Sequence, residues 1–79
     1  MRAIIYIRLK TEVLDPQGQA IESALKNLGE NNIKNIRQGK LIEMDVEAKN
    51  KEEAKEKIEK ITKSLLANTV IEEYSIEIS

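Results

Sequence analysis

The stretch that most constrains the fold is residues 13–20, where an alternating pattern ends and a helical one begins. Pro16 lacks a backbone N–H and has a fixed φ, and both properties suit the first position of a helix. Asp15 comes directly before it and can cap the free amides of that first turn. Residues 13–20 therefore predict a corner between a strand and a helix.

Gly18 is the unexpected residue of this corner, because glycine inside a first helical turn lowers the stability of the helix. It is either a tolerated weakness, which helix propensity alone favours, or a place where the backbone of another chain comes close. A residue without a Cβ leaves room for such an approach. The sequence leaves both interpretations open.

Hydrophobic spacing predicts a strand before the corner and a helix after it. Residues 3–10 alternate in the way that is typical of a half-buried strand. The side chains expected on its core face are those of Ala3, Ile5, Ile7 and Leu9. Ile4 and Tyr6 fall on the other face, which is therefore not wholly polar. Residues 17–28 carry one apolar stripe at helical spacing, and Gly29 is expected to end that helix as a left-handed cap.

The middle of the chain, residues 33–48, predicts two antiparallel strands joined by a tight turn at Gln38, Gly39 and Lys40. Gly39 can adopt the positive φ that such a turn requires. The alternative is one long strand with a glycine bulge at Gly39, which could reach across into a partner chain.

The last part of the chain predicts a helix over residues 50–67 and a closing strand over residues 70–78. Asn50 and Glu53 have the spacing of a capping box. The many Lys and Glu residues of the helix form i,i+4 pairs, which is typical of a solvated helix face.

The order β-α-β-β-α-β is that of the split βαβ, or ferredoxin-like, fold. We therefore expect an α+β domain with a four-stranded antiparallel sheet and both helices on one face. Right-handed crossovers place the first strand between the third and the fourth. Arg8 and Lys10 on the open face of that strand would then lie opposite acidic residues of its neighbours.

The chain is small for a protein that folds alone. Its 79 residues form one domain, residues 1–79, and Cys 0 excludes disulfide bonds. A core of this size seldom gives more than a few kcal/mol, so assembly with other chains is the common remedy. A net charge of −1 argues against nucleic acid and membrane surfaces as partners. Without a signal peptide or membrane span, a cytoplasmic location is expected.

The side chains offer little for catalysis. His 0 and Cys 0 remove the commonest general base and the thiolate nucleophile. Carboxylates on an exposed strand keep ordinary pKa values, so we expect no catalytic residue and no metal site. Arg37, Gly39 and Lys40 could hold an anion at a glycine turn, although basic turns of this kind are usually only solvated. Phe 0 and Trp 0 argue against an RNA-binding sheet.

Three segments together resemble the PurS family, over essentially the whole chain. They are Val-Leu-Asp-Pro-Gln-Gly at 13–18, Ile-Arg-Gln-Gly-Lys-Leu-Ile-Glu at 36–43, and Leu-Leu-Ala-Asn at 65–68 followed by Val-Ile-Glu-Glu-Tyr at 70–74. Thr69 departs from the pattern, since the family often has proline there. PurS is the small subunit of phosphoribosylformylglycinamidine synthase, also called formylglycinamide ribonucleotide amidotransferase.

The resemblance implies a non-catalytic subunit in de novo purine biosynthesis. It would bridge a glutaminase subunit and a large synthetase subunit, assist ammonia transfer between them, and act as a dimer or higher oligomer. ATP and Mg would be used by the large subunit, with no cofactor bound by this chain. The residues expected to touch the partner subunits are Asp15, Gln17, Gly18, Arg37, Gly39 and Lys40. Ile4 and Tyr6 are expected in the dimer interface. The alternative is a free-standing ferredoxin-like regulatory domain that binds a small ligand at its dimer interface.

Overall fold

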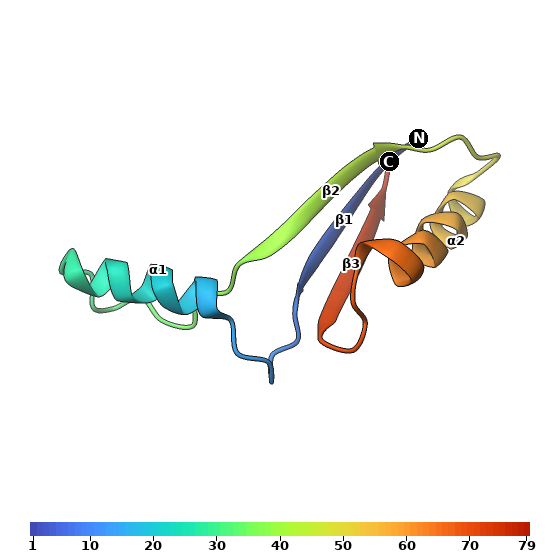
Figure 1. Ribbon diagram of the computed structural model, residues 1–79. Helices are drawn as coiled ribbons and strands as arrows, with labels where there is room; N and C mark the ends of the chain where they lie inside the picture. The colour runs from blue at the N-terminus through green and yellow to red at the C-terminus, as the bar shows by residue number, and fades with distance from the viewer.

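Three antiparallel strands form a single sheet in the computed structural model, which describes residues 1–79 (Figure 1). β1 (Arg2–Leu9) lies between β2 (Gly39–Asp45) and β3 (Glu72–Ile78). In this register Ile5 pairs with Ile42 on one side and with Ile76 on the other. The predicted first strand and its central position are confirmed.

The core lies on one face of the sheet, under α2 (Lys51–Ile61). Its seven buried apolar side chains are Ala3, Ile5, Ile7, Val46, Ala54, Ile58 and Ala67. The predicted alternation of β1 and the predicted second helix are thus confirmed. Asn50 caps α2, because its side-chain oxygen accepts a hydrogen bond of 2.8 Å from the N–H of Glu53. This cap fixes the start of the helix that covers the core.

α2 continues into a π-helical segment, η1 (Thr62–Leu66). The hydroxyl of Thr62 is buried and donates a hydrogen bond of 2.7 Å to the carbonyl oxygen of Ile58. A π-helical turn holds more residues than an α-helical turn and rotates the side chains that follow it. Leu65, which lies at helical spacing from Ile58 and Ile61 in the sequence, is therefore 78% exposed, and Ala67 is buried in its place.

The fourth strand predicted from residues 33–48 is absent. Residues 30–38 form no strand, and Asn35 has a φ of 58°, which is left-handed backbone. The chain returns along α1 and then enters β2 at Gly39 (Figure 1). Gly39 is required for space and not for a turn. A Cβ at this position would lie 2.6 Å from the carbonyl oxygen of Ile7 on the neighbouring strand. The chain thus forms neither the expected hairpin nor a long bulged strand, but one strand that begins at Gly39.

The first helix, α1 (Pro16–Asn27), does not pack on the sheet. Its N-terminal signals work as expected, with Asp15 as the cap and Pro16 in the first position. The C-terminal prediction is also confirmed, because Gly29 has a φ of +88°. However, α1 extends beyond the end of the sheet, clear of α2 (Figure 1). The expectation of two helices on one face is therefore wrong for the single chain, which leaves the ferredoxin-like arrangement incomplete.

Of the two basic residues predicted to pair across the open face of the sheet, Arg8 does so, whereas Lys10 lies beyond the end of β1 and makes no ion pair. Arg8 forms an ion pair of 2.7 Å with Glu73 of β3. At the other end of β1, Arg2 contacts Glu43 at 3.0 Å and Asp45 at 3.2 Å, both on β2. Each of these exposed ion pairs contributes little to stability. Together they place opposite charges on adjacent strands, which favours the observed strand register.

Candidate functional site

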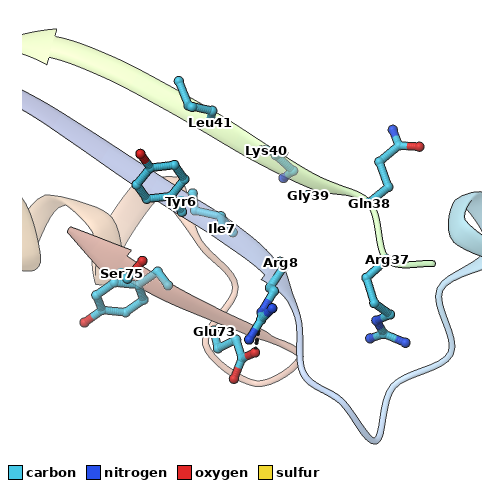
Figure 2. A pocket seen from close by; sticks show the side chains of 11 residues that line it. Tyr6, Ile7, Arg8, Arg37, Gln38, Gly39, Lys40, Leu41, Glu73 and Ser75 are labelled. Atoms are coloured by element: carbon cyan, nitrogen blue, oxygen red, sulfur yellow. Dashed lines mark hydrogen bonds and ion pairs between the residues drawn. The ribbon is translucent and has the colours of Figure 1, made fainter. Parts of the chain in front are cut away.

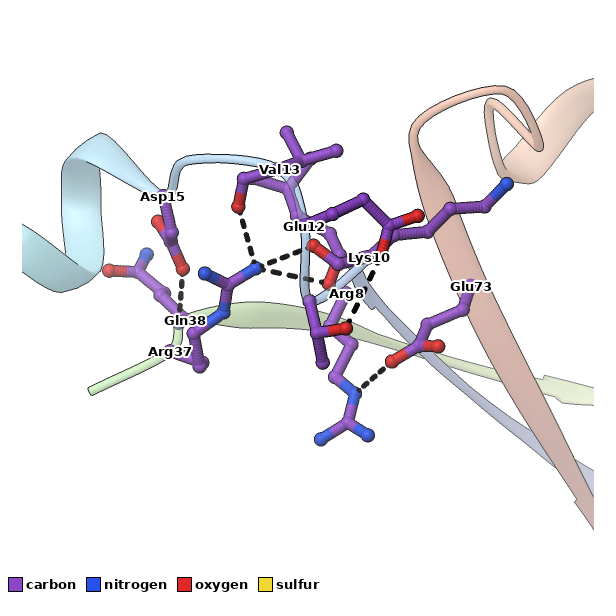
Figure 3. Close-up of polar contacts among 10 residues, drawn as sticks. Arg8, Lys10, Glu12, Val13, Asp15, Arg37, Gln38 and Glu73 are labelled. Atoms are coloured by element: carbon purple, nitrogen blue, oxygen red, sulfur yellow. Dashed lines mark hydrogen bonds and ion pairs between the residues drawn. The ribbon is translucent and has the colours of Figure 1, made fainter. Parts of the chain in front are cut away.

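A cluster of contacts ties the base of α1 to the segment that precedes β2 (Figure 3). We call it the α1 junction, and its residues are Asp15, Gly18, Ile36, Arg37 and Gln38. The carboxylate of Asp15 accepts a hydrogen bond of 3.0 Å from the N–H of Gly18 and another of 2.8 Å from the N–H of Gln38. One side chain therefore caps α1 and also fixes the entry to β2.

The two backbone donors hold the pKa of the Asp15 carboxyl below its ordinary value. The N–H of Gly18 has the largest effect, that of Gln38 the second, and the charge of Arg37 lowers the pKa further. Burial acts in the opposite direction, since Asp15 is only 5% exposed. Asp15 is therefore ionised at neutral pH, and each of its oxygens has a backbone partner.

Arg37 holds the other side of the α1 junction. Its guanidinium Nη2 donates to the carbonyl oxygens of Lys10 at 2.9 Å, Val13 at 3.0 Å and Leu9 at 3.3 Å (Figure 3). These carbonyls belong to the end of β1 and the loop that follows it, and the carbonyl of Lys10 also accepts a hydrogen bond of 2.9 Å from the N–H of Val13. The anion site considered for Arg37, Gly39 and Lys40 loses one cation in this way, because the Arg37 guanidinium faces into its own chain.

Gly18 is buried where α1 meets the returning segment. A Cβ at this position would overlap the carbonyl oxygen of Ile36 and lie 3.0 Å from its carbonyl carbon. The interpretation of Gly18 as a tolerated weakness is therefore wrong. A backbone does come close, and it is the backbone of residue 36 in the same chain.

Asp15→Asn is expected to weaken the protein and to make its stability less sensitive to acid. An amide cannot accept from both N–H groups, so one buried donor loses its partner. Because the Asp15 pKa is lowered on folding, its stabilisation is complete above the ordinary carboxyl value of about 4 and is lost as pH falls through the lower folded value. Urea unfolding at pH 7 and between pH 5 and pH 2 measures both effects.

Asp45→Asn is the matched control for this prediction. The side chain of Asp45 is 87% exposed and pairs only with Arg2, so its replacement should leave the urea midpoint nearly unchanged. Equal midpoints for the two variants at pH 7 would contradict the role assigned to Asp15.

The structure gathers the six residues expected to touch partner subunits around the α1 junction. A hollow of about 400 Å³ is lined by Asp15, Gln17, Gly39 and Lys40. A larger hollow of about 670 Å³ lies over the α1 end of the sheet and includes Arg37, Gly39, Lys40 and Tyr6 in its lining (Figure 2). Residues far apart in the sequence thus line two neighbouring hollows.

The expected contact residues differ in how much of them a partner could reach. Gln17, Arg37, Gly39 and Lys40 are exposed, while Asp15 and Gly18 are buried within the α1 junction. Lys40 pairs with Glu72 of β3 at 3.5 Å. The exposed four are available for direct contact, whereas the buried two shape the surface.

The two residues expected in the dimer interface lie on the open face of β1. Ile4 is half-buried, and Tyr6 is 39% exposed and donates a hydrogen bond of 3.2 Å to the carboxylate of Glu77. The negative charge of Glu77 is the largest cause of a raised pKa at the Tyr6 hydroxyl. Tyr6 therefore keeps its proton at neutral pH and remains a hydrogen-bond donor.

Ile36 and Gln38 lie in the segment 36–43 that carries the family resemblance, but residue type did not identify them as parts of the site. Both act through backbone atoms, namely the carbonyl of Ile36 beside Gly18 and the N–H of Gln38 on Asp15. In each contact, the residue that the sequence analysis did single out was the other partner, namely Gly18 or Asp15. Such signals name one partner of a contact and leave the other unidentified.

The fold and the site define a class of protein: a small α+β chain with an ion-paired open sheet face and a first helix that does not pack on the sheet of its own chain. A family model described as PurS, phosphoribosylformylglycinamidine (FGAM) synthase, matches residues 2–79. A PurS subunit of phosphoribosylformylglycinamidine synthase from Methanocaldococcus jannaschii is 43% identical over 77 residues, which cover 98% of this chain and 93% of the relative. The chain belongs to the PurS family, whose members are subunits of FGAM synthase in purine biosynthesis.

Solved structures agree with this assignment. The crystal structure of Methanocaldococcus jannaschii PurS has a TM-score of 0.91 at 42% identity, covering 99% of this chain and 94% of that one. A chain in the structure of PurLQS from Thermotoga maritima has a TM-score of 0.88 at 38% identity, with 96% and 93% covered. The three-stranded sheet with a detached first helix is therefore also the fold of its solved relatives.

Proposed function

We propose that this chain is the non-catalytic subunit that bridges the glutaminase and synthetase subunits of FGAM synthase. The complex would convert formylglycinamide ribonucleotide to formylglycinamidine ribonucleotide with ATP and glutamine, and the chain would assist the transfer of ammonia. The observation that carries the proposal is the full-length likeness to PurS, including a chain within a PurLQS structure from Thermotoga maritima.

A cytoplasmic location belongs to the same proposal. Neither helix has the length and apolar character that crossing a membrane requires.

Two features of the site support a bridging role over a catalytic one. The carboxylates of Glu43, Asp45 and Glu73 on the open face are engaged by arginines, and each of these side chains is at least 41% exposed. They lack the burial that adapts a carboxylate to acid or base catalysis. ATP and Mg would accordingly belong to the synthetase subunit, and this chain would bind no cofactor. The chain would act as a homodimer, with Ile4 and Tyr6 in the interface between copies.

Reconstitution with two nitrogen sources tests whether the chain couples the glutaminase to the synthetase. The synthetase and glutaminase subunits are assayed with and without this chain, once with glutamine and once with an ammonium salt as the nitrogen source. If the chain assists ammonia transfer, its omission abolishes the glutamine-dependent activity and spares the ammonium-dependent activity. Unchanged glutamine-dependent activity without the chain would refute the proposal, and binding of a small ligand by the isolated dimer would then favour a regulatory domain.

Lys40→Glu is expected to weaken binding to the partner subunits about tenfold, because it reverses a charge at the edge of both hollows. Lys63→Glu is the matched control. Both lysine side chains are similarly exposed, at 64% and 60%, and each pairs with one glutamate, but Lys63 lies in η1, away from the α1 junction. Arg37 is a poorer probe, since its replacement also breaks the three hydrogen bonds to the loop.

Titration calorimetry of each variant with the synthetase subunit, with and without the glutaminase subunit, measures the effect. Equal affinity of Lys40→Glu and wild type, with both folded, would remove Lys40 from the proposed contact surface. An equal loss for Lys63→Glu would show that the effect reflects overall charge and not this surface.

A further inference from the structure

β3 forms one edge of the sheet, and its outer side has no neighbouring strand (Figure 1). At one end of its ladder with β1, Arg2 and Ser79 form a hydrogen-bonded pair, since each N–H donates to the other's carbonyl at 2.9 Å. Hydrogen-bonded and non-hydrogen-bonded pairs alternate along an antiparallel ladder. Every second residue of β3 therefore directs its N–H and C=O groups outward. The outward residues with no other backbone partner are Tyr74, Ile76 and Ile78.

This edge lacks several of the devices that keep a free strand from pairing with other chains. β3 has seven residues, with no proline and no lysine among them, and no bulge interrupts its register with β1. Its three outward residues, with one N–H and one C=O each, offer six backbone groups. Such a row of groups is a template for a further strand, so β3 is open to pairing on its outer side.

The side chains on the helix-covered face of β3 form an apolar row along this edge. Tyr74, Ile76 and Ile78 are only half-buried, although they pack against the core. The hydroxyl of Tyr74 donates a hydrogen bond of 3.4 Å to the carboxylate of Glu59, so the row lies beside α2. Apolar side chains on an added strand would extend this layer and cover the row.

The side chains on the open face of β3 form an acidic row. β3 contains three glutamates and no basic residue, and two of the glutamates, Glu73 and Glu77, lie on this face. Glu73 pairs with Arg8, whereas no ion pair includes Glu77, which accepts a hydrogen bond of 3.2 Å from the Tyr6 hydroxyl. Basic side chains on an added strand would therefore find an opposite charge across the edge.

The same charges oppose pairing between two copies of β3. An antiparallel pair of these edges centred on Ser75 would place Glu73 of one copy directly opposite Glu77 of the other. Like charges in that position are destabilising. A strand from a different chain with basic side chains meets no such repulsion and is attracted to the edge. The edge therefore suits a heterologous strand better than a second copy.

We propose that β3 receives an added strand from a partner subunit of FGAM synthase, namely an extended segment whose side chains alternate between apolar and basic. Its apolar side chains would lie beside Tyr74 and Ile76, and its basic side chains beside Glu73 and Glu77. In strand addition the backbone bonds give affinity, and the alternating side chains give specificity. The inference rests on the proposed function, because it names a second surface, away from the α1 junction, by which the chain holds a partner.

A proline at position 76 tests the pairing. Ile76→Pro removes one outward N–H and leaves the hydrogen bonds between β3 and β1 in place, which edge strands tolerate. Ile76→Ala is the matched control, since it also shortens the side chain but keeps the N–H. Titration calorimetry of each variant with the synthetase and glutaminase subunits together measures the affinity. We expect Ile76→Pro to bind about tenfold more weakly than Ile76→Ala.

Glu77→Lys tests the charge of the edge without a change in the backbone. We expect it to bind the two subunits about tenfold more weakly than the wild type, whose own affinity should fall as the salt concentration rises. Glu56→Lys makes the same change at an exposed position of α2 and should bind like the wild type. Circular dichroism and analytical ultracentrifugation first establish the folding and the oligomeric state of every variant.

Equal affinities of Ile76→Pro and Ile76→Ala would overturn the strand addition. A change of oligomeric state in Ile76→Pro alone would also overturn it, because β3 would then pair between copies. If Ile76→Pro does not fold, equal affinities of Glu77→Lys and Glu56→Lys decide against the proposal. Failure of the proposed function gives a different result, since the wild type would then not bind the two subunits and its omission would leave the glutamine-dependent activity unchanged.

Discussion

Gly18→Ala is expected to destabilise the protein by about 3 kcal/mol, the upper end of the usual cost of over-packing. The added methyl would overlap the carbonyl oxygen of Ile36 and approach the Asp15 Oδ2 to 3.2 Å. Neither neighbour can move freely, because both belong to the α1 junction that joins α1 to the segment before β2. Urea unfolding at one fixed protein concentration measures the change in the free energy of unfolding.

Gly29→Ala separates the effect of space from that of backbone conformation. Gly29 has a φ of +88°, and a Cβ added there would meet nothing within 4 Å, so only the left-handed conformation opposes a side chain. The expected cost is about 1 kcal/mol. If both alanine variants lost the same free energy, close packing at Gly18 would not be what limits that position.

Ile5→Ala is expected to cost about 4 kcal/mol and to leave the chain largely unfolded at about 37 °C. Ile5 is fully buried, at the centre of β1 between Ile42 and Ile76. Removing such a side chain typically costs about 2–5 kcal/mol, because the transfer free energy is lost and a cavity remains. The core holds only seven buried apolar residues, so it has little stability in reserve.

A graded series checks that packing is the cause. Ile5→Val removes one methylene from the same place and should cost about 1 kcal/mol. Leu65→Ala removes a side chain that is 78% exposed and should change the free energy of unfolding by less than about 0.5 kcal/mol. Thermal and urea unfolding, both at constant protein concentration, should rank the variants in this order. A loss for Leu65→Ala as large as that for Ile5→Ala would contradict the assignment of the core.

The site was predicted less completely than the fold. Asp15 as a cap and charge pairs such as Arg8 with Glu73 follow from residue type and spacing. The contacts of Arg37 could not be predicted in this way, because its partners are three backbone carbonyls that lie 24 to 28 residues away in the chain. A side-chain pattern cannot identify a carbonyl, since every residue has one.

The amino-acid sequence by itself determined the two helices and the three strands that form, the central place of β1, and the faces of β1 and α2. These properties depend on local spacing and on capping residues such as Asp15 and Asn50, which act within one or two turns. Only the tertiary structure decided that residues 33–38 form no strand and that α1 extends away from the sheet. Those outcomes depend on contacts of residues 15–18 with the backbone of residues 36–38, which lie about 20 residues further along the chain. The contacts set the direction of α1 relative to the sheet, and no local sequence pattern specifies that direction.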